Sequence, residues 1–130
     1  MTRINSRTKG HSYERKIVKE WKELTGSEDI WTSRNMSLAM DAMGVDIVGS
    51  GIPYHIQCKA VEKSMDLHSI LERMPTDKPP IIIHKKNGGR EIVVMSKEHF
   101  YAIQRGAIAA MGLEKWSDIV QRTPTVWDFL

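Results

Sequence analysis

The sequence predicts an α/β domain in which a mixed five-stranded sheet is flanked by helices, in the order helix, three strands, helix, two strands, helix. Two patterns lead to this fold class. Apolar residues recur at helical spacing in three segments, and short β-branched runs are joined in pairs by turns that contain glycine. The length of 130 residues suits a single domain with one hydrophobic core.

The first helix is expected to begin near Ser12 and to end before Thr25. Four large apolar residues recur at intervals of four, four and three residues: Tyr13, Ile17, Trp21 and Leu24. Glu14 lies on the inward flank of this stripe. A carboxylate there is costly unless it is paired or binds a cation, although a glutamate stabilised by the helix dipole is the alternative explanation.

A short strand is expected at residues 30–34, followed by the methionine-rich segment NMSLAMDAMG (35–44). Methionines at helical spacing usually fill a core or form a flexible flap, and wedging into DNA is a less common use. Residues 44–60, GVDIVGSGIPYHIQCKA, are expected to form a hairpin, because β-branched residues flank a turn made of glycine, serine and proline.

The second half of the chain repeats this alternation. Ser64 is expected to cap a helix whose apolar face comprises Leu67, Ile70, Leu71 and Met74. Residues 81–83 are expected to form a strand buried on both faces, with 91–95 as its hairpin neighbour. Ser96 is expected to cap a last helix that ends at Gly112 and turns Phe100, Ile103, Ala107 and Met111 inward.

Charge is distributed unevenly along the chain. The formal net charge is +3, but residues 1–22 contain seven bases and two acids, a net of 7 − 2 = +5, which leaves −2 for the remainder. A basic segment on a nearly neutral body suggests a polyanionic partner, because lysine and arginine neutralise phosphates and release counterions. A solvated basic arm over residues 1–9 is the alternative.

Cysteine content and hydropathy indicate a cytoplasmic protein, in the host cytoplasm if a phage encodes it. The one cysteine, Cys58, excludes an internal disulfide and suits a reducing compartment. No apolar run approaches the length of a membrane span, and the N-terminus lacks the apolar core of a secretory signal.

Polar residues occupy unexpected positions in the central hairpin. Asp46 lies between two β-branched residues, while Gln57 and Lys59 share one strand face and Cys58 lies on the other. If the first helix packs on the face of Gln57 and Lys59, then Glu14, Asp46 and Gln57 can converge beside Lys59. Such hard oxygen ligands suit Mg²⁺, which Mn²⁺ can replace, whereas the scattered histidines and one cysteine suggest no zinc site.

Three segments carry a family resemblance: KGHSYERKIVKEW (9–21), GVDIVG (44–49) and IQCK (56–59). This pattern resembles the PD-(D/E)XK nucleases, and most closely the archaeal and phage type of Holliday junction resolvase. The resemblance implies a restriction-endonuclease-like core and a metal-dependent endonuclease that resolves four-way DNA junctions by symmetric phosphodiester hydrolysis, with roles in recombination and repair. It covers roughly residues 9–110 in element order.

The resemblance also implies roles for individual residues. Glu14, Asp46, Gln57 and the backbone carbonyl of Cys58 would hold one or two Mg²⁺ ions, which polarise the scissile phosphate. Lys59 would orient the attacking water or stabilise the transition state; a structural salt bridge to Asp46 is the alternative. Gln57 departs from the family, which usually has an acid there, so a non-cleaving DNA-binding or assembly protein stays open, as does a nuclease for ordinary duplex or DNA ends.

The sequence also suggests contacts with DNA and with a second subunit. Basic and hydroxyl side chains are the candidate phosphate contacts: Arg3, Arg7, Lys9, Arg15, Ser33, Arg34, Lys85 and Lys86, with Arg90 as a weaker candidate. Because a junction has near two-fold symmetry and one chain has one site, we expect a C₂ homodimer. Its interface would use the last helix and the 113–130 extension, with Trp116, Val126, Trp127 and Phe129, unless that extension covers its own subunit.

Overall fold

The computed structural model describes residues 6–61 and 64–112. The helices are α1 (Ser6–Thr25), α2 (Ser33–Met36), α3 (Leu38–Ala42), α4 (Leu67–Arg73) and α5 (Lys97–Ala110). The strands are β1 (Ile30–Thr32), β2 (Ile47–Gly49), β3 (His55–Lys59), β4 (Pro80–Lys85) and β5 (Glu91–Val94). None of these described helices is both long and apolar enough to cross a membrane.

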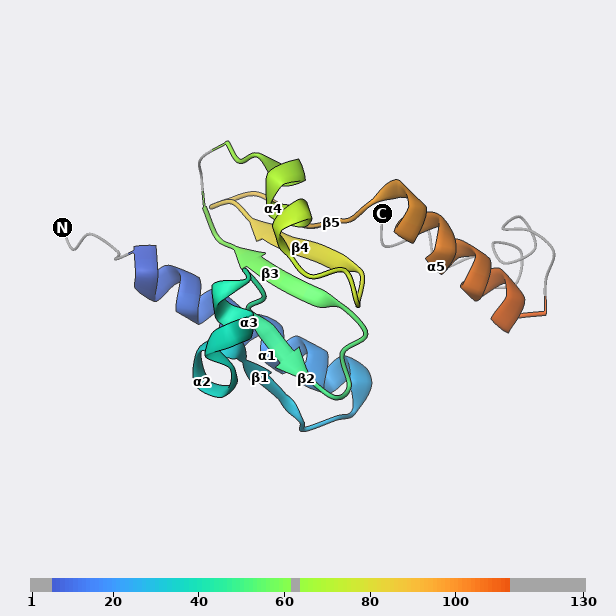
Figure 1. Cartoon of the computed structure of the whole chain (residues 1–130), viewed down its shortest axis with the longest axis horizontal. Coiled ribbons are helices and arrows are strands. Elements are labelled where there is room, and N and C mark those ends of the chain that lie inside the picture. Colours follow the sequence, from blue (N-terminus) through green and yellow to red (C-terminus); the bar gives the residue numbers. More distant parts are fainter. Residues whose placement is uncertain (1–5, 62–63, 113–130) are drawn as a thin grey trace. The chain divides into compact units, whose positions relative to one another are not determined.

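The five strands form one mixed sheet in the order β1-β2-β3-β4-β5 (Figure 1). Neighbouring strands are antiparallel except β3 and β4, which are parallel and are connected through α4. A parallel pair needs such a crossover, whereas both hairpins are closed by short turns. The expectation of an α/β fold with a mixed five-stranded sheet flanked by helices is therefore confirmed.

Helices cover both faces of this sheet, with α1 on one face and α4 on the other (Figure 1). On the α1 face, Tyr13 and Ile17 pack against the buried isoleucines of the strands, and Trp21 and Cys58 adjoin this core. On the α4 face, Ile82 packs with Val45 and Met74. Strand β4, which lies between β3 and β5, is buried on both faces, as the run Ile81–Ile83 predicts.

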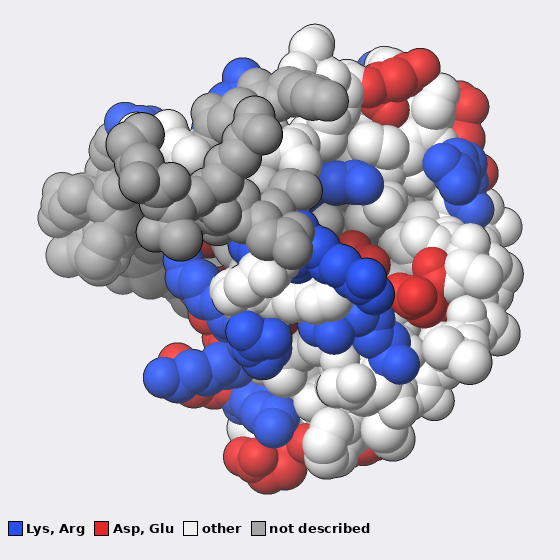
Figure 2. All heavy atoms as spheres, turned by 90° about the vertical axis from the view of Figure 1, so that its left-hand side faces the viewer, with Lys and Arg blue, Asp and Glu red and all other residues white. Residues whose placement is uncertain are grey.

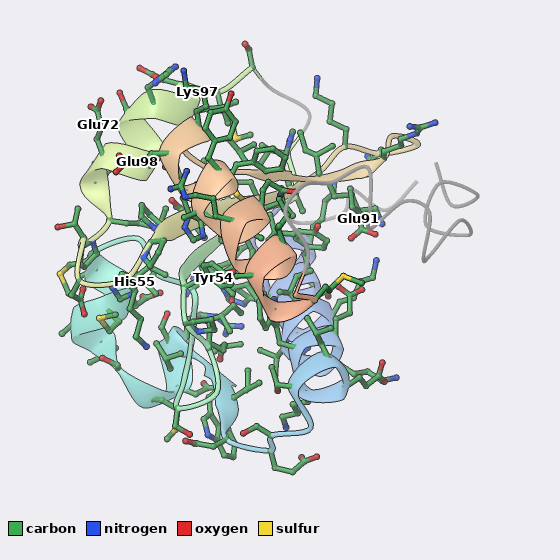
Figure 3. All side chains as sticks on the ribbon, turned by 90° about the vertical axis from the view of Figure 1, so that its right-hand side faces the viewer. Tyr54, His55, Glu72, Glu91, Lys97 and Glu98 are labelled. Carbon is green, nitrogen blue, oxygen red and sulfur yellow. The ribbon has the colours of Figure 1, made fainter. Side chains whose placement is uncertain are left out.

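Tyr54 and His55, adjacent at the start of β3, lie on opposite sides of the sheet (Figure 3). Tyr54 contacts Trp21 of α1 edge to face, with ring centroids 5.8 Å apart. The buried His55 imidazole instead lies 2.7 Å from the Asp77 carboxylate. This alternation fixes the faces of the whole strand, so Gln57 and Lys59 lie on the His55 side, away from α1.

Several expected boundaries are wrong. Helix α1 begins at Ser6 rather than near Ser12, and Leu24 at its end is 75% exposed, because the stripe turns away from the sheet in the last turn. Asp66, not Ser64, caps α4, since its carboxylate accepts a hydrogen bond from the Ser69 amide at 3.1 Å.

The strand expected at residues 30–34 ends at Thr32, because α2 begins at Ser33, and the methionine-rich segment lies in the two short helices α2 and α3. Ser37 ends α2 and caps α3 by accepting a hydrogen bond from the Met40 amide. Met40 adjoins the α4-side core, but Met36 and Met43 are exposed. Core filling therefore holds for Met40 and is wrong for the other two.

The chain divides after Met95 into two compact units. The first contains the sheet and α1 to α4, and the second contains α5. Ser96 caps α5 as expected, by accepting a hydrogen bond from the His99 amide, but no residue of α5 is buried and Phe100 is 48% exposed. The expected inward face of this helix is therefore wrong for Phe100 and Met111. Arg3 and the 113–130 extension lie outside the described residues.

Candidate functional site

Backbone hydrogen bonds fix Asp46 at the entrance to β2. Its amide donates to the Ile56 carbonyl at 2.7 Å, and its carbonyl accepts from the Ser33 amide at 2.8 Å. Gly44, with φ of 81°, makes the turn that leads from α3 to this position, a conformation that glycine adopts without strain. Asp46 is thus held by β3 on one side and by the start of α2 on the other.

Gln57 lies beside the turn that leads to Asp46. Ile47 pairs with Ile56 in antiparallel register, but the Asp46 amide also donates to the Ile56 carbonyl, one residue out of the register that would pair Asp46 with Gln57, so the ladder is irregular at Asp46. A Cβ atom added to Gly44 would lie 3.6 Å from the Gln57 Oε1 atom, which places this amide beside the turn that carries Asp46. The Asp46 Oδ2 atom accepts a hydrogen bond from the Cys58 amide at 2.8 Å.

Burial makes the Asp46 carboxylate unusually basic. Loss of hydration is the largest of the effects that together raise its pKa from 3.8 to about 7; the charges of Glu14 and Asp41 also raise the pKa, whereas the Cys58 amide and Lys59 lower it. The Cys58 amide and Lys59 therefore do not offset the cost of holding a negative charge on the partly buried Asp46. A cation bound beside Asp46 would relieve that cost.

Glu14 reaches this site from α1, although not by the predicted packing. Helix α1 covers the face of Ile56 and Cys58, because these are the apolar positions of β3; the expectation that it packs on the Gln57 and Lys59 face is wrong. The Glu14 side chain, only 13% exposed, instead pairs with the Arg34 guanidinium of α2 at 3.0 Å. Its charge still raises the pKa of both Asp46 and Cys58.

Lys59 completes the group of residues that the sequence singled out. Its charge lowers the pKa of Asp46, which places the ammonium group within electrostatic range. Among the described residues, the ion pairs within 4.0 Å include none between Lys59 and Asp46. A structural salt bridge therefore does not account for Lys59 here.

The donor set suits a hard divalent cation. Glu14 and Asp46 offer carboxylates and Gln57 offers an amide oxygen, which are ligand types that Mg²⁺ accepts while it keeps several waters. In residues 6–61 and 64–112, no group of three or more His, Cys, Asp or Glu side chains is arranged to hold a metal ion. The third donor would therefore have to be the Gln57 amide or a backbone carbonyl such as that of Cys58.

Two polar residues beside Asp46 have roles that sequence reasoning did not assign. Asp41 of α3, which was not predicted at all, raises the pKa of Asp46 and accepts a hydrogen bond from the Ser33 hydroxyl at 3.3 Å. Ser33, expected to contact DNA, is fully buried and positions Asp46 through its amide. No local motif predicts these contacts, because they join α2, α3 and β2.

The other candidate phosphate contacts lie on surface segments. Arg7, Lys9 and Arg15 belong to α1, and Arg15 donates to the Ser12 hydroxyl at 3.2 Å. Lys85 ends β4, and Lys86 is exposed in the turn to β5. Figure 2 shows the end of the molecule where α1 begins, with lysine and arginine side chains gathered across its middle.

Comparison with protein-family models, curated proteins and solved structures finds no match to this chain. Its function is therefore inferred from its own residues.

Proposed function

We propose that this protein is a Mg²⁺-dependent, structure-selective DNA endonuclease, with four-way junctions as its principal substrate. The observation that carries the proposal is Asp46, a carboxylate whose pKa burial raises to about 7 in a site that also holds Glu14, Gln57 and Lys59. Two oxygen donors on one hairpin, a second carboxylate from α1 and a lysine two residues after the amide are the parts that metal-assisted phosphodiester hydrolysis needs.

Each residue has a distinct task in this proposal. Asp46 and Gln57 would hold the cation on the hairpin, and Glu14 would add a ligand from α1. A bound Mg²⁺ supplies the Lewis acidity that polarises the scissile phosphate. Lys59 would stabilise the charge that develops on the phosphate oxygens. Arg34 keeps the Glu14 carboxylate oriented through their 3.0 Å contact.

Gln57 favours one alternative, a DNA-binding protein that does not cleave. An amide in place of a third acid removes one negative charge from the site and weakens its attraction for Mg²⁺. In that case DNA binding would persist without hydrolysis in the presence of Mg²⁺ or Mn²⁺.

The test compares three labelled substrates: a four-way junction, a linear duplex and a single strand, each with Mg²⁺ and with chelator. We expect Mg²⁺-dependent cleavage of the junction at paired, symmetric positions. Asp46→Asn should abolish cleavage while leaving junction binding in chelator nearly unchanged, because the substitution does not weaken attraction to phosphate.

The matched control is Asp29→Asn, which makes the same chemical change at an exposed aspartate that bonds to Ser50 and Trp31. This variant should cleave like the wild type. Full activity in Asp46→Asn would refute the assigned site. Preferential cleavage of the linear duplex would keep the chemistry but change the substrate.

A further inference from the structure

Thr32, the last residue of β1, has a buried hydroxyl group with no hydrogen-bond partner in the part of the chain that the structure describes. The residue is only 6% exposed. Buried polar groups are nearly always paired, because an unpaired group loses its hydrogen bonds to water, so an exception calls for a water, an ion or a ligand. We propose that Thr32 is a positioning residue of the candidate metal site, where its hydroxyl binds a water molecule of the Mg²⁺ hydration shell. This inference rests on the proposed function.

The position of Thr32 in the chain does not account for its hydroxyl. Thr32 is the N-cap residue of α2, where a threonine hydroxyl ordinarily accepts a hydrogen bond from an amide of the first turn, but its side chain makes no such bond. Ser37, Asp66 and Ser96 do accept this bond at the start of α3, α4 and α5. The Thr32 side chain is therefore oriented by the sheet and not by the helix that follows it.

Strand register places the Thr32 side chain on the face of the sheet that α1 covers. Thr32 pairs directly with Ile47 of β2, and residues opposite each other in antiparallel strands share a face. Ile47 packs in the core that includes Tyr13 of α1. Alternation along β1 agrees, because Ile30 belongs to the same core and Trp31, between Ile30 and Thr32, is 42% exposed.

The two residues after Thr32 hold the two carboxylate-bearing residues of the candidate metal site. The Ser33 amide donates to the Asp46 carbonyl at 2.8 Å. The Arg34 guanidinium contacts the Glu14 carboxylate at 3.0 Å, and Glu14 belongs to α1, on the same side of the sheet as the Thr32 hydroxyl. The unpaired hydroxyl is therefore one residue from a contact to Asp46 and two residues from a contact to Glu14.

The chemistry of a hydroxyl suits the hydration shell of this cation. Mg²⁺ keeps several waters in protein sites, and the hydrogens of those waters need acceptors. The Thr32 oxygen can accept a hydrogen bond from one such water while its own hydrogen is donated to another. Groups that hold the ligands of a metal from outside typically contribute a factor of roughly 10 to 100 to metal affinity.

The first measurement compares the Mg²⁺ affinity of the wild type, Thr32→Val and Thr32→Ser by isothermal titration calorimetry. Valine has nearly the shape of threonine but no hydroxyl, whereas serine keeps the hydroxyl and lacks the methyl group. We expect Thr32→Val to weaken Mg²⁺ binding by roughly tenfold or more, and Thr32→Ser to retain most of the affinity. Wild-type affinity in Thr32→Val, or an equal loss in both variants, would overturn the proposal.

The second measurement is urea unfolding in chelator, which separates a role in metal binding from a structural role. Because the hydroxyl is buried and unpaired, its removal in Thr32→Val should leave the urea midpoint unchanged or raise it. A lower midpoint for Thr32→Val would mean that the hydroxyl stabilises the metal-free fold, and that result would also overturn the proposal.

Thr25→Val is the matched control, because it makes the same change at a hydroxyl that has partners. The Thr25 hydroxyl donates to the Trp21 carbonyl at 2.7 Å and accepts from the Ser27 amide at 3.2 Å. This variant should lower the urea midpoint and leave the Mg²⁺ affinity unchanged. A loss of Mg²⁺ affinity as large as that of Thr32→Val would show that the effect is not specific to Thr32.

Cleavage assays separate failure of this inference from failure of the proposed function. If the wild type binds Mg²⁺ and cleaves the junction, and Thr32→Val binds Mg²⁺ equally well, the nuclease stands and the assignment of Thr32 fails. If Mg²⁺ binding depends on the Thr32 hydroxyl but no DNA substrate is cleaved, the assignment of Thr32 stands and the nuclease fails.

Discussion

At the scale of single residues, Asp46 shows the cost of building an anionic site into a sheet. Its amide and carbonyl are used by Ile56 and Ser33, so the backbone holds it where its side chain loses water. One amide hydrogen bond from Cys58 does not offset that loss, and the pKa stays near 7. The charged form of Asp46 therefore lowers the stability of the folded protein, and perturbed carboxylates of this kind are common at functional sites.

Asp46→Asn should therefore stabilise the protein at high pH. The folded-state pKa is raised, so the stability that protonation of Asp46 contributes is fully present below 3.8 and is lost as the pH rises towards about 7. The shift corresponds to at most about 4 kcal/mol. Urea unfolding should show a gain in the free energy of unfolding for Asp46→Asn that grows between these pH values and then levels off.

Asp29→Asn again provides the control, because hydrogen bonds from Ser50 and Trp31 lower the pKa of Asp29. This variant should lose stability where Asp46→Asn gains it. A flat difference between Asp46→Asn and wild type across pH would contradict the burial of the charge. Added Mg²⁺ should raise the melting temperature of the wild type more than that of Asp46→Asn, since ligand binding stabilises the folded state.

Substitutions of Gln57 test whether its side-chain amide is a ligand of Mg²⁺. Gln57→Glu adds a carboxylate beside Gly44, in the turn that leads to Asp46, so it should destabilise the protein without metal and tighten Mg²⁺ binding. Gln57→Ala should weaken Mg²⁺ binding, and isothermal titration calorimetry measures both constants. Identical Mg²⁺ affinities in wild type and both variants would assign Gln57 a structural role.

At the scale of elements, the Glu14 and Arg34 pair connects α1 to α2 across the candidate site. The contact is 3.0 Å long, and the two side chains are 13% and 28% exposed. Arg34→Ala leaves the Glu14 carboxylate partly buried and without this cation, which should cost roughly 1–3 kcal/mol of the free energy of unfolding.

A double-mutant cycle with Glu14→Gln isolates the interaction between the two side chains. We expect a coupling energy of about 0.5–3 kcal/mol, measured by urea unfolding of the four proteins. The pair formed by Lys22 and Glu28, 3.6 Å apart with Glu28 90% exposed, is the matched comparison and should couple by less than about 1 kcal/mol. Equal coupling in the two pairs would show that burial does not strengthen the contact.

Elements whose signal is local could be predicted from the sequence. Alternation fixed the faces of β3, and the run Ile81–Ile83 indicated a strand covered on both sides. The residues around Asp46 depend instead on tertiary contacts. The side of the sheet covered by α1 depends on which face of β3 is apolar. The contacts of Arg34 with Glu14 and of Asp41 with Ser33 join different helices, and no local pattern indicates which helices meet.

At the scale of the whole molecule, the chain divides after Met95 into two units, and the candidate metal site and α5 belong to different units. Every described residue of the candidate metal site lies in the first unit, and Met95 packs on its core. Helix α5 exposes Phe100 and Tyr101, which are 48% and 50% accessible. Exposed aromatic side chains are typical of interface cores, which makes α5 the candidate dimer element.

We therefore expect a fragment of residues 1–95 to fold, bind Mg²⁺ and bind junctions, but to remain a monomer that nicks one strand at a time. The full chain should be a dimer at micromolar concentration and should cut both strands in paired fashion, because two sites related by a two-fold axis match the junction. Sedimentation velocity gives the assembly state, and a supercoiled cruciform plasmid separates nicking from linearisation.

The 1–95 fragment lacks both α5 and the residues after it. The variant Phe100→Ser with Tyr101→Ser keeps the full chain and changes only the exposed aromatic residues of α5, so it tests whether α5 itself forms the dimer interface. If α5 forms the interface, this variant should resemble the fragment in both assembly and nicking, while its circular dichroism spectrum stays that of the wild type. If this variant remains a dimer, the dimer interface lies elsewhere in the chain. A full chain that is strictly monomeric and still makes paired cuts would refute the argument from junction symmetry, since one subunit would then have to act twice on one substrate.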